Sequence, residues 1–200
     1  MAPTVAEPQH NLSPDLFLRE KNFPAFIEAI TPGQSNLDMC IQCGSCGGSC
    51  PSARDMEHTP RQIFALMRAN AIEEVLQSNT PWYCVSCYLC MSRCPQDVHI
   101  TDLMYTLKSL AIQTGYAQEN KSADFSLTFA TYVEANGRSF ELGLATRQYF
   151  RYHPLGFSGM ASMGWGMLSR GRLHLTPERI KGAEQLSKIL EHAKQLEVTQ

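Results

Sequence analysis

The sequence lacks the features that mark membrane, secreted and nucleic-acid-binding proteins. No apolar run approaches the roughly 20 residues that span a bilayer. The first residues, MAPTVAEPQHN, have no apolar segment after a basic start, as a secretory signal would. The 17 Lys and Arg residues are balanced by 19 Asp and Glu residues, so no basic excess suggests nucleic acid as a partner. We therefore expect a soluble cytoplasmic protein with no membrane span.

Several kinds of chemistry are missing as well. No glycine-rich phosphate loop is present, which argues against flavin or nucleotide binding by this chain. The six histidines, at positions 10, 58, 99, 153, 174 and 192, show no metal-ligand spacing, although His99 lies close enough to Cys94 in sequence to influence its surroundings. No cysteine lies outside two short runs, so no thiol is left over for catalysis.

The two runs contain all eight cysteines of the chain. The first run is CIQCGSCGGSCP (40–51) and the second is CVSCYLCMSRCP (84–95). Both have the pattern Cys-x2-Cys-x2-Cys-x3-Cys-Pro. In a reducing compartment, grouped cysteines bind metal or perform redox chemistry more often than they form structural disulfides.

Three interpretations of the eight thiols compete. A disulfide framework is disfavoured because nothing indicates secretion and the chain is long enough to build a core. Structural zinc usually takes two Cys-x2-Cys pairs separated by a loop, and it does not require a third cysteine or the order seen here. A [4Fe–4S] cluster has four irons that each bind one thiolate, and the repeated pattern is typical of proteins that hold two such clusters. Iron–sulfur is therefore the favoured interpretation.

The same pattern predicts which cysteines share a cluster. Three cysteines at successive x2 steps can reach three corners of one cube, while the fourth points away and ligates the other cluster. The prediction is that one [4Fe–4S] cluster is held by Cys40, Cys43, Cys46 and Cys94, and the second by Cys84, Cys87, Cys90 and Cys50. Such cross-ligation makes the two clusters neighbours, as an electron relay needs. Gly44, Gly47 and Gly48 either let the backbone approach the first cluster closely or only permit turns.

Apolar spacing and caps predict helices and no strands, hence an all-α fold. Proline at the first helical position and apolar residues at helical spacing are the main signs. The expected helices cover 13–20, 23–30, a segment starting at Thr59-Pro60, a segment around 72–76, about 101–114, 123–136, 141–152 and a segment starting at Thr176-Pro177. In the helix over 123–136 we expect Phe125, Phe129, Tyr132 and Val133 to share one face.

Two such cysteine runs separated by helices resemble the alpha-helical ferredoxin domain. The short chain with a helical C-terminal extension resembles the C-type iron–sulfur subunit of heterodisulfide reductase and its bacterial relatives, and SRGRLHLTPERIKG (169–182) is similar to a segment found late in those proteins. The resemblance implies an alpha-helical ferredoxin domain over 37–115 with two [4Fe–4S] clusters, an N-terminal helical extension over 1–36 and a helical C-terminal extension over 116–200.

The resemblance also implies a function. In that family, electrons pass between two other subunits: the A-type one contains flavin, and the B-type one is catalytic and carries paired Cys-Cys-Gly motifs that this chain lacks. The expectation is a non-catalytic electron-transfer subunit of a hetero-oligomeric, heterodisulfide-reductase-like complex in sulfur or heterodisulfide metabolism. The Met/Gly/Trp stretch 155–168 and the segment 171–182 are expected to dock the catalytic B-type subunit. The alternative is an interaction module whose iron–sulfur or zinc sites are only structural.

Overall fold

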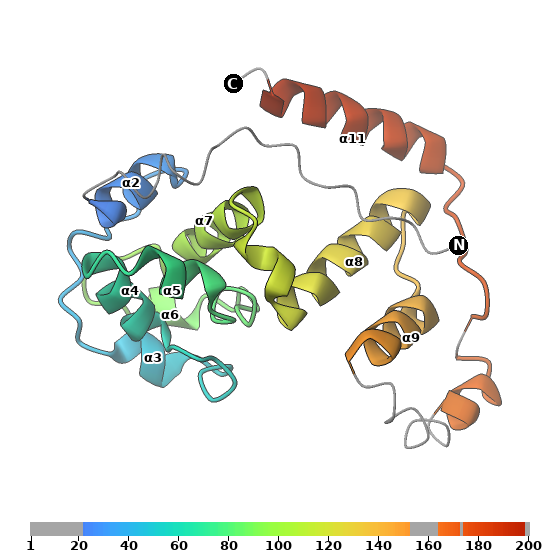
Figure 1. Ribbon diagram of the computed structural model, residues 1–200, viewed down its shortest axis with the longest axis horizontal. Coiled ribbons are helices and arrows are strands. Elements are labelled where there is room, and N and C mark those ends of the chain that lie inside the picture. The colour runs from blue at the N-terminus through green and yellow to red at the C-terminus, as the bar shows by residue number, and fades with distance from the viewer. Residues whose placement is uncertain (1–21, 153–163, 173, 199–200) are drawn as a thin grey trace. The chain divides into compact units, whose positions relative to one another are not determined.

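The computed structural model describes residues 22–152, 164–172 and 174–198. Every regular element in these ranges is a helix, so the all-helical prediction is confirmed for them (Figure 1). The helix expected over 13–20 lies outside the described residues. Among those that are described, no helix combines the length and apolar character needed to cross a membrane. The helices are α2 (Phe23–Ile30), α3 (Ser45–Ser49), α4 (Pro60–Arg68), α5 (Ile72–Gln77), α6 (Leu89–Ser92), α7 (Ile100–Gln113), η1 (Tyr116–Glu119), α8 (Lys121–Asn136), α9 (Glu141–Tyr152) and α11 (Ala183–Val198).

The described chain forms two compact units that divide within α8, between Asp124 and Phe125. The N-terminal unit contains both cysteine runs. Its core is built from one buried face each of α2, α4, α5 and α7, where Phe23, Ile63, Leu103 and Leu107 are fully buried. We call it the cysteine unit. Helix α2 is part of this core, and its first residue is fixed by a 2.9 Å bond from the Phe23 amide to Asn70 Oδ1.

Helices α4 and α7 are equivalent parts of an internal repeat. Each follows one cysteine run, and each buries residues at the same four positions along the helix. In α4 these are Pro60, Ile63, Phe64 and Met67, and in α7 they are Ile100, Leu103, Met104 and Leu107. The helical part of the repeat is hard to recognise in the sequence, because the apolar side chains at matching positions are chemically similar and not identical. The repeat therefore includes the run and the helix that follows it, while the connecting loops, 51–59 and 95–99, differ in length.

Local sequence explains where these two helices begin and end. Pro60 is the first residue of α4, and the Thr59 amide donates to Gln62 Oε1 at 2.8 Å. Both features belong to a helix N-terminus, since proline has no amide to lose and the glutamine side chain reaches back to the cap. Helix α7 is followed by Gly115, whose φ of 83° is the left-handed conformation that commonly ends helices.

In the C-terminal unit one expectation is wrong. Thr176-Pro177 does not start a helix, because α11 begins only at Ala183. The described segment before it has no regular structure, and Ile180 is held by a 2.9 Å bond from its amide to the Asn136 carbonyl, with its side chain against Gly137. The bond between Ile180 and Asn136, which are far apart in the chain, thus outweighs the local preference of Thr176-Pro177 for a helix start.

The apolar face predicted on α8 is not the buried face of that helix. The side chains of Phe125 and Phe129 are 45% and 44% exposed, while Tyr132 is buried. The buried stripe of the helix consists of Ala123, Asp124, Thr128, Tyr132 and Asn136. The position of the helix was predicted correctly. Its buried face could not be predicted from apolar spacing, because three of the buried side chains are polar.

Candidate metal centres

The eight cysteines line two cavities of the cysteine unit, four in each. The first cavity is lined by Cys40, Cys43, Cys46 and Cys94, together with residues of the first run, α4 and α7. The second cavity is lined by Cys50, Cys84, Cys87 and Cys90, together with residues of the second run, α4 and α7. Each cavity thus receives three cysteines from one run and the fourth cysteine from the other.

The short helices α3 and α6 produce this exchange. Cys46 lies within α3 and lines the first cavity, whereas Cys50 follows the last residue of α3, where the chain is extended, and lines the second cavity. Likewise, Cys90 lies within α6 and lines the second cavity, whereas Cys94, two residues after the end of α6, lines the first cavity. The two helices contact each other. Ending a helix shortly before the fourth cysteine therefore directs that cysteine toward the neighbouring cavity.

Left-handed residues at matching positions curl each run around its cavity. Gln42 and Ser86 have φ values of 59° and 54°, and Gly44 and Tyr88 have φ values of 87° and 59°. Alternating right- and left-handed residues turn successive amides toward one concave side, which favours bound anions and iron–sulfur clusters. Consistent with this, no backbone carbonyl of the described residues accepts a bond from the amides of residues 41–44 or 85–88.

Glycine is favoured at two positions of the first run, for different reasons. Gly44 adopts the left-handed conformation, which costs other residues about 1–2 kcal/mol. Gly47 lies against the start of α4, where an added Cβ would come within 3.3 Å of Thr59 Cβ. The second run has Tyr88 at the position of Gly44. The glycines therefore shape the turn and its packing on α4.

Hydrogen-bond donors point at several cysteine sulfurs. The Val98 amide donates to Cys94 Sγ at 3.4 Å. The hydroxyl and the amide of Ser45 lower the pKa of Cys43, the hydroxyl having the larger effect, and the Ser45 oxygen lies 3.4 Å from the Cys43 sulfur. Donors in these positions stabilise negative charge on sulfur, which is the charge that a cluster places there.

Burial acts in the opposite direction on the inner cysteines. It raises the pKa of Cys46 to about 11, and it also raises the pKa of Cys50 and Cys90. A thiol in such surroundings keeps its proton at neutral pH unless a metal displaces it. The cavities therefore need the positive charge of bound iron before all four cysteines can be thiolates.

Apolar side chains close the inner side of both cavities. Phe64 lines the first cavity and Met104, its equivalent in the repeat, lines the second. Ile100, the buried first residue of α7, lines both cavities at once. The cavities are thus neighbours that share one side chain.

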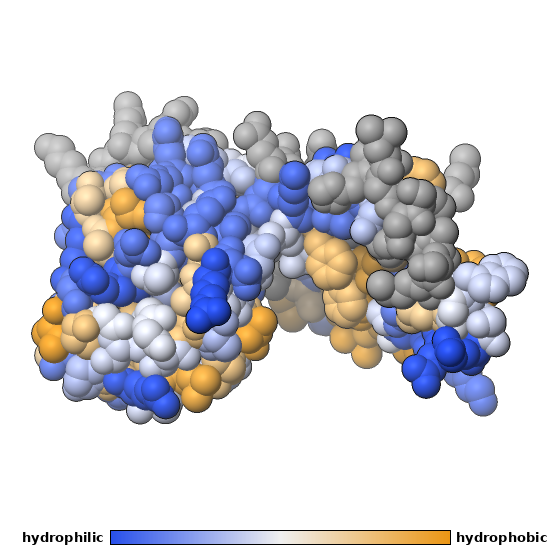
Figure 2. Space-filling view, turned by 90° about the horizontal axis from the view of Figure 1, so that it is seen from below, coloured by the Kyte–Doolittle hydropathy of each residue, from blue (hydrophilic) through white to orange (hydrophobic). Residues whose placement is uncertain are grey.

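The outer side of each cavity reaches the surface at one cysteine. Cys43 and Cys87, the second cysteines of the two runs, are exposed, and the other six are partly buried. Ile41 and Val85, which occupy matching positions beside them, are 61% and 66% exposed. Figure 2 shows such hydrophobic side chains scattered over the otherwise hydrophilic surface of the cysteine unit.

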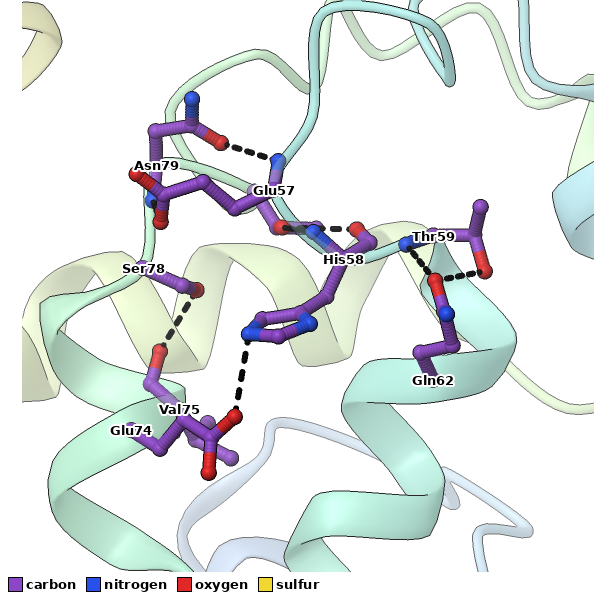
Figure 3. A network of polar contacts seen from close by, with 9 residues as sticks. Glu57, His58, Thr59, Gln62, Glu74, Val75, Ser78 and Asn79 are labelled. Carbon is purple, nitrogen blue, oxygen red and sulfur yellow. Dashed lines mark hydrogen bonds and ion pairs between the residues drawn. The ribbon is translucent and has the colours of Figure 1, made fainter.

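A polar network fastens the segment after Cys50 to the segment before Cys84 (Figure 3). The Glu57 amide donates to Asn79 Oδ1 at 2.8 Å, and the Asn79 amide donates to Glu57 Oε2 at 2.9 Å. The next residue, His58, is bound through its amide and its carbonyl to the buried Thr80 hydroxyl, at 3.0 and 2.7 Å. These bonds hold together the two chain segments whose cysteines meet in the second cavity.

Other polar residues near the cysteines have mixed roles. His58 Nε2 lies 3.4 Å from Glu74 Oε1, and His99 Nδ1 lies 3.4 Å from Asp102 Oδ2, so neither imidazole lines a cysteine cavity. Sequence analysis missed Thr101, whose hydroxyl is 4.0 Å from the Cys90 sulfur and lowers the pKa of that cysteine against the larger effect of burial.

The donor set fits an iron–sulfur cluster. In the ranges that the structure describes, no three His, Cys, Asp or Glu side chains gather as ligands of a single metal ion. The cysteines surround cavities instead, with unpaired amides at the rim and apolar side chains behind. Four thiols arranged in this way, with amides available to the sulfurs, are what a [4Fe–4S] cluster requires.

Comparison with known proteins agrees with this chemistry. Residues 36–98 match the family of 4Fe-4S dicluster domains. This segment is therefore of the class that binds iron–sulfur clusters of the 4Fe-4S type, and a dicluster domain is consistent with two of them.

The curated relatives are iron–sulfur subunits of reductases. The chain is 38% identical over 109 residues to the second C-type iron-sulfur subunit of the CoB–CoM heterodisulfide reductase of Methanocaldococcus jannaschii, covering 54% of this chain and 58% of that protein. It is 36% identical over 125 residues to the C-type subunit of the H2:CoB-CoM heterodisulfide, ferredoxin reductase of Methanothermobacter marburgensis, covering 62% and 66%. The predicted resemblance to the C-type subunit of heterodisulfide reductase is confirmed for this portion, and the aligned portions span about half to two thirds of these relatives.

A glycine pair in the first run tests the conformational argument. Gly44→Ala should destabilise the cysteine unit by about 1–2 kcal/mol, because alanine pays the left-handed penalty that glycine avoids. Gly48→Ala is the matched control: it lies in α3 with no atom within 4 Å of the added Cβ, so it should be neutral or stabilising by up to about 1 kcal/mol. Thermal midpoints of the anaerobic proteins, followed by helical circular dichroism, measure both. Equal midpoints for the two variants would contradict the argument.

Proposed function

We propose that the chain is an electron-transfer iron–sulfur subunit of a heterodisulfide-reductase-like complex. Its alpha-helical ferredoxin domain would relay electrons through two [4Fe–4S] clusters between the flavin-containing A-type subunit of such a complex and its catalytic B-type subunit. The observation that carries the proposal is the pair of neighbouring four-cysteine cavities, which share Ile100 and reach the surface at separate cysteines. A structural site does not need a second cluster ligand at the surface, whereas an electron relay needs one surface-exposed ligand toward each partner.

The proposed ligands follow the two cavities. Cys40, Cys43, Cys46 and Cys94 would hold one cluster, and Cys84, Cys87, Cys90 and Cys50 the other. We assign the cluster domain to 37–115, with 1–36 as an N-terminal extension and 116–200 as a C-terminal extension that docks a partner.

The chain's own residues would support electron transfer in three ways. A bound [4Fe–4S] cluster supplies a centre that gains and loses one electron. Amide and hydroxyl donors at the rim would stabilise its negative charge, and Ile100 with its apolar neighbours would keep water from the space between the cavities. At the surface, Ile41 beside Cys43 and Val85 beside Cys87 would give each partner an apolar contact close to a ligand.

Metal content is the first test. Anaerobically purified protein should contain about eight iron and eight sulfide per chain, because each of two cubes holds four of each. Reduction should produce electron paramagnetic resonance signals of two interacting clusters, since the cavities are neighbours. Stoichiometric zinc with little iron would support the alternative of a structural interaction module and refute the relay.

Exchange of the fourth cysteine is the second test. Cys50→Ala should damage the cluster of Cys84, Cys87 and Cys90, although Cys50 belongs to the first run. Cys94→Ala should damage the cluster of Cys40, Cys43 and Cys46. The two variants serve as controls for each other in iron analysis and in the spectra of the remaining cluster. If Cys50→Ala instead damages the cluster of its own first run, and Cys94→Ala that of its own second run, the ligands are not exchanged.

The C-terminal extension gives a third test. Much of the stretch 155–168 lies outside the described residues, but in its described part Trp165 is 72% exposed and Met167 and Leu168 are also exposed. Deleting 155–200 should leave both clusters assembled and reducible, because all eight cysteines lie in the other compact unit. It should abolish co-purification with the proposed catalytic partner, and Trp165→Ala alone should weaken it. If the truncated chain retains its partner fully, the docking proposal is wrong.

A further inference from the structure

One carbonyl in each cysteine run is held by a cation from the helix that follows. Arg68 Nη2 donates to the Cys40 carbonyl at 2.5 Å, and Lys108 Nζ donates to the Cys84 carbonyl at 3.3 Å. Cys40 and Cys84 are the first cysteines of their runs. Arg68 and Lys108 lie at the same position of α4 and α7, each directly after the last of the matching buried residues, Met67 and Leu107. The contact is therefore part of the internal repeat.

Each cation also has a second contact close to its run. Arg68 Nη2 is within 3.3 Å of the Asp38 carbonyl. Lys108 Nζ lies 5.2 Å from the centre of the Tyr105 ring, and the Tyr105 hydroxyl is 2.6 Å from the Ser86 hydroxyl. Both runs are thus fixed close to their first cysteine by a positive charge.

Holding this carbonyl fixes the direction of the next amide. The peptide unit is planar and trans, so the amide of the following residue points opposite to the carbonyl oxygen. The following residues are Ile41 and Val85, and each lines its own cavity. Neither amide has a carbonyl acceptor among the described residues, so both remain available to a sulfur of the cluster.

We propose that Arg68 and Lys108 are equivalent positioning residues, each of which orients the peptide after the first cysteine of its run and raises the reduction potential of that run's cluster alone. The proposal rests on the proposed two-cluster function. Two effects act in the same direction, since an amide turned toward the sulfurs and a nearby positive charge both stabilise the reduced, more negative cluster. Arginine and lysine differ in their contacts, because the guanidinium reaches several carbonyls and the ammonium acts as a point charge, but both supply the positive charge.

The test uses the full chain with both clusters loaded. Lys108→Met and Arg68→Met are compared with Lys108→Arg and Arg68→Lys, which keep the charge. Arg93→Met is the matched control, because Arg93 is an exposed cation of the second run whose side chain has no assigned contact in the described structure. Midpoint potentials are measured by redox titration followed by electron paramagnetic resonance, after iron analysis. The two signals are assigned with the Cys50→Ala and Cys94→Ala variants.

The expected result is selective. Lys108→Met should lower the midpoint potential of the cluster that contains Cys84 and leave the other unchanged, and Arg68→Met should do the converse for the cluster that contains Cys40. The charge-conserving variants should restore most of each shift, and Arg93→Met should shift neither potential as far. Shifts of both clusters together, or an equal shift in Arg93→Met, would overturn the proposal.

Two further outcomes are decisive. If Lys108→Met fails to hold iron, Lys108→Gln replaces it, because its amide can still donate to the Cys84 carbonyl but carries no charge. An unchanged potential in loaded Lys108→Gln would overturn the electrostatic part. Unchanged potentials in all variants with full iron would refute this inference and leave the relay intact, whereas failure of the relay itself would appear as missing iron in the unsubstituted chain.

Discussion

The exchange of one cysteine between the two runs is the constraint on which the cysteine unit depends. Cys50 lines the cavity of the second run and Cys94 lines that of the first, so neither cavity is complete without both runs. Helices α3 and α6 must therefore lie in contact, and the helices that follow them, α4 and α7, are brought to the same core. The bonds of Glu57 and His58 to Asn79 and Thr80 also join the segment after Cys50 to the segment before Cys84. Cluster binding by these ligands would therefore stabilise the folded unit.

Each cavity has an apolar inner side, which disfavours negative charge on sulfur, and a polar outer side, which stabilises that charge. The inner side is apolar, and burial there raises the pKa of Cys46 to about 11 and that of Cys90 as well. The outer side presents amides without carbonyl acceptors, the Ser45 hydroxyl and an exposed cysteine. An anionic centre in a fully apolar site would be too costly to charge, and in a fully polar site it would be exposed to water. Placing donors on one side only resolves this conflict and leaves a route for electrons to the surface.

The sequence predicted the parts of the site that depend on local spacing. The cysteine pattern led to two sets of four, and the structure places the same two sets around two cavities. Helices α4 and α7 were predicted from caps and apolar spacing. The role of Gly47 against Thr59 and the cations on the Cys40 and Cys84 carbonyls could not be predicted, because each joins residues far apart in the chain. For the same reason the apparent helix cap at Thr176-Pro177 gave a wrong prediction, since the Ile180 amide is bound to the distant Asn136 carbonyl.

The two halves of the repeat share a backbone but differ in the side chains that face the cavities. The first cavity has Arg61 and Phe64 where the second has Thr101 and Met104. The left-handed position after the second cysteine is Gly44 in one run and Tyr88 in the other. A symmetric pair of clusters would have equal potentials and would give electrons no preferred position. Because net charge, hydrogen bonds to sulfur and exposure set the potential of a cluster, these substitutions make the two sites unequal while the shared backbone keeps them adjacent. Adjacency lets an electron pass between two bound clusters, and inequality decides which of them holds a single electron, whereas the donor and the acceptor set the direction of flow.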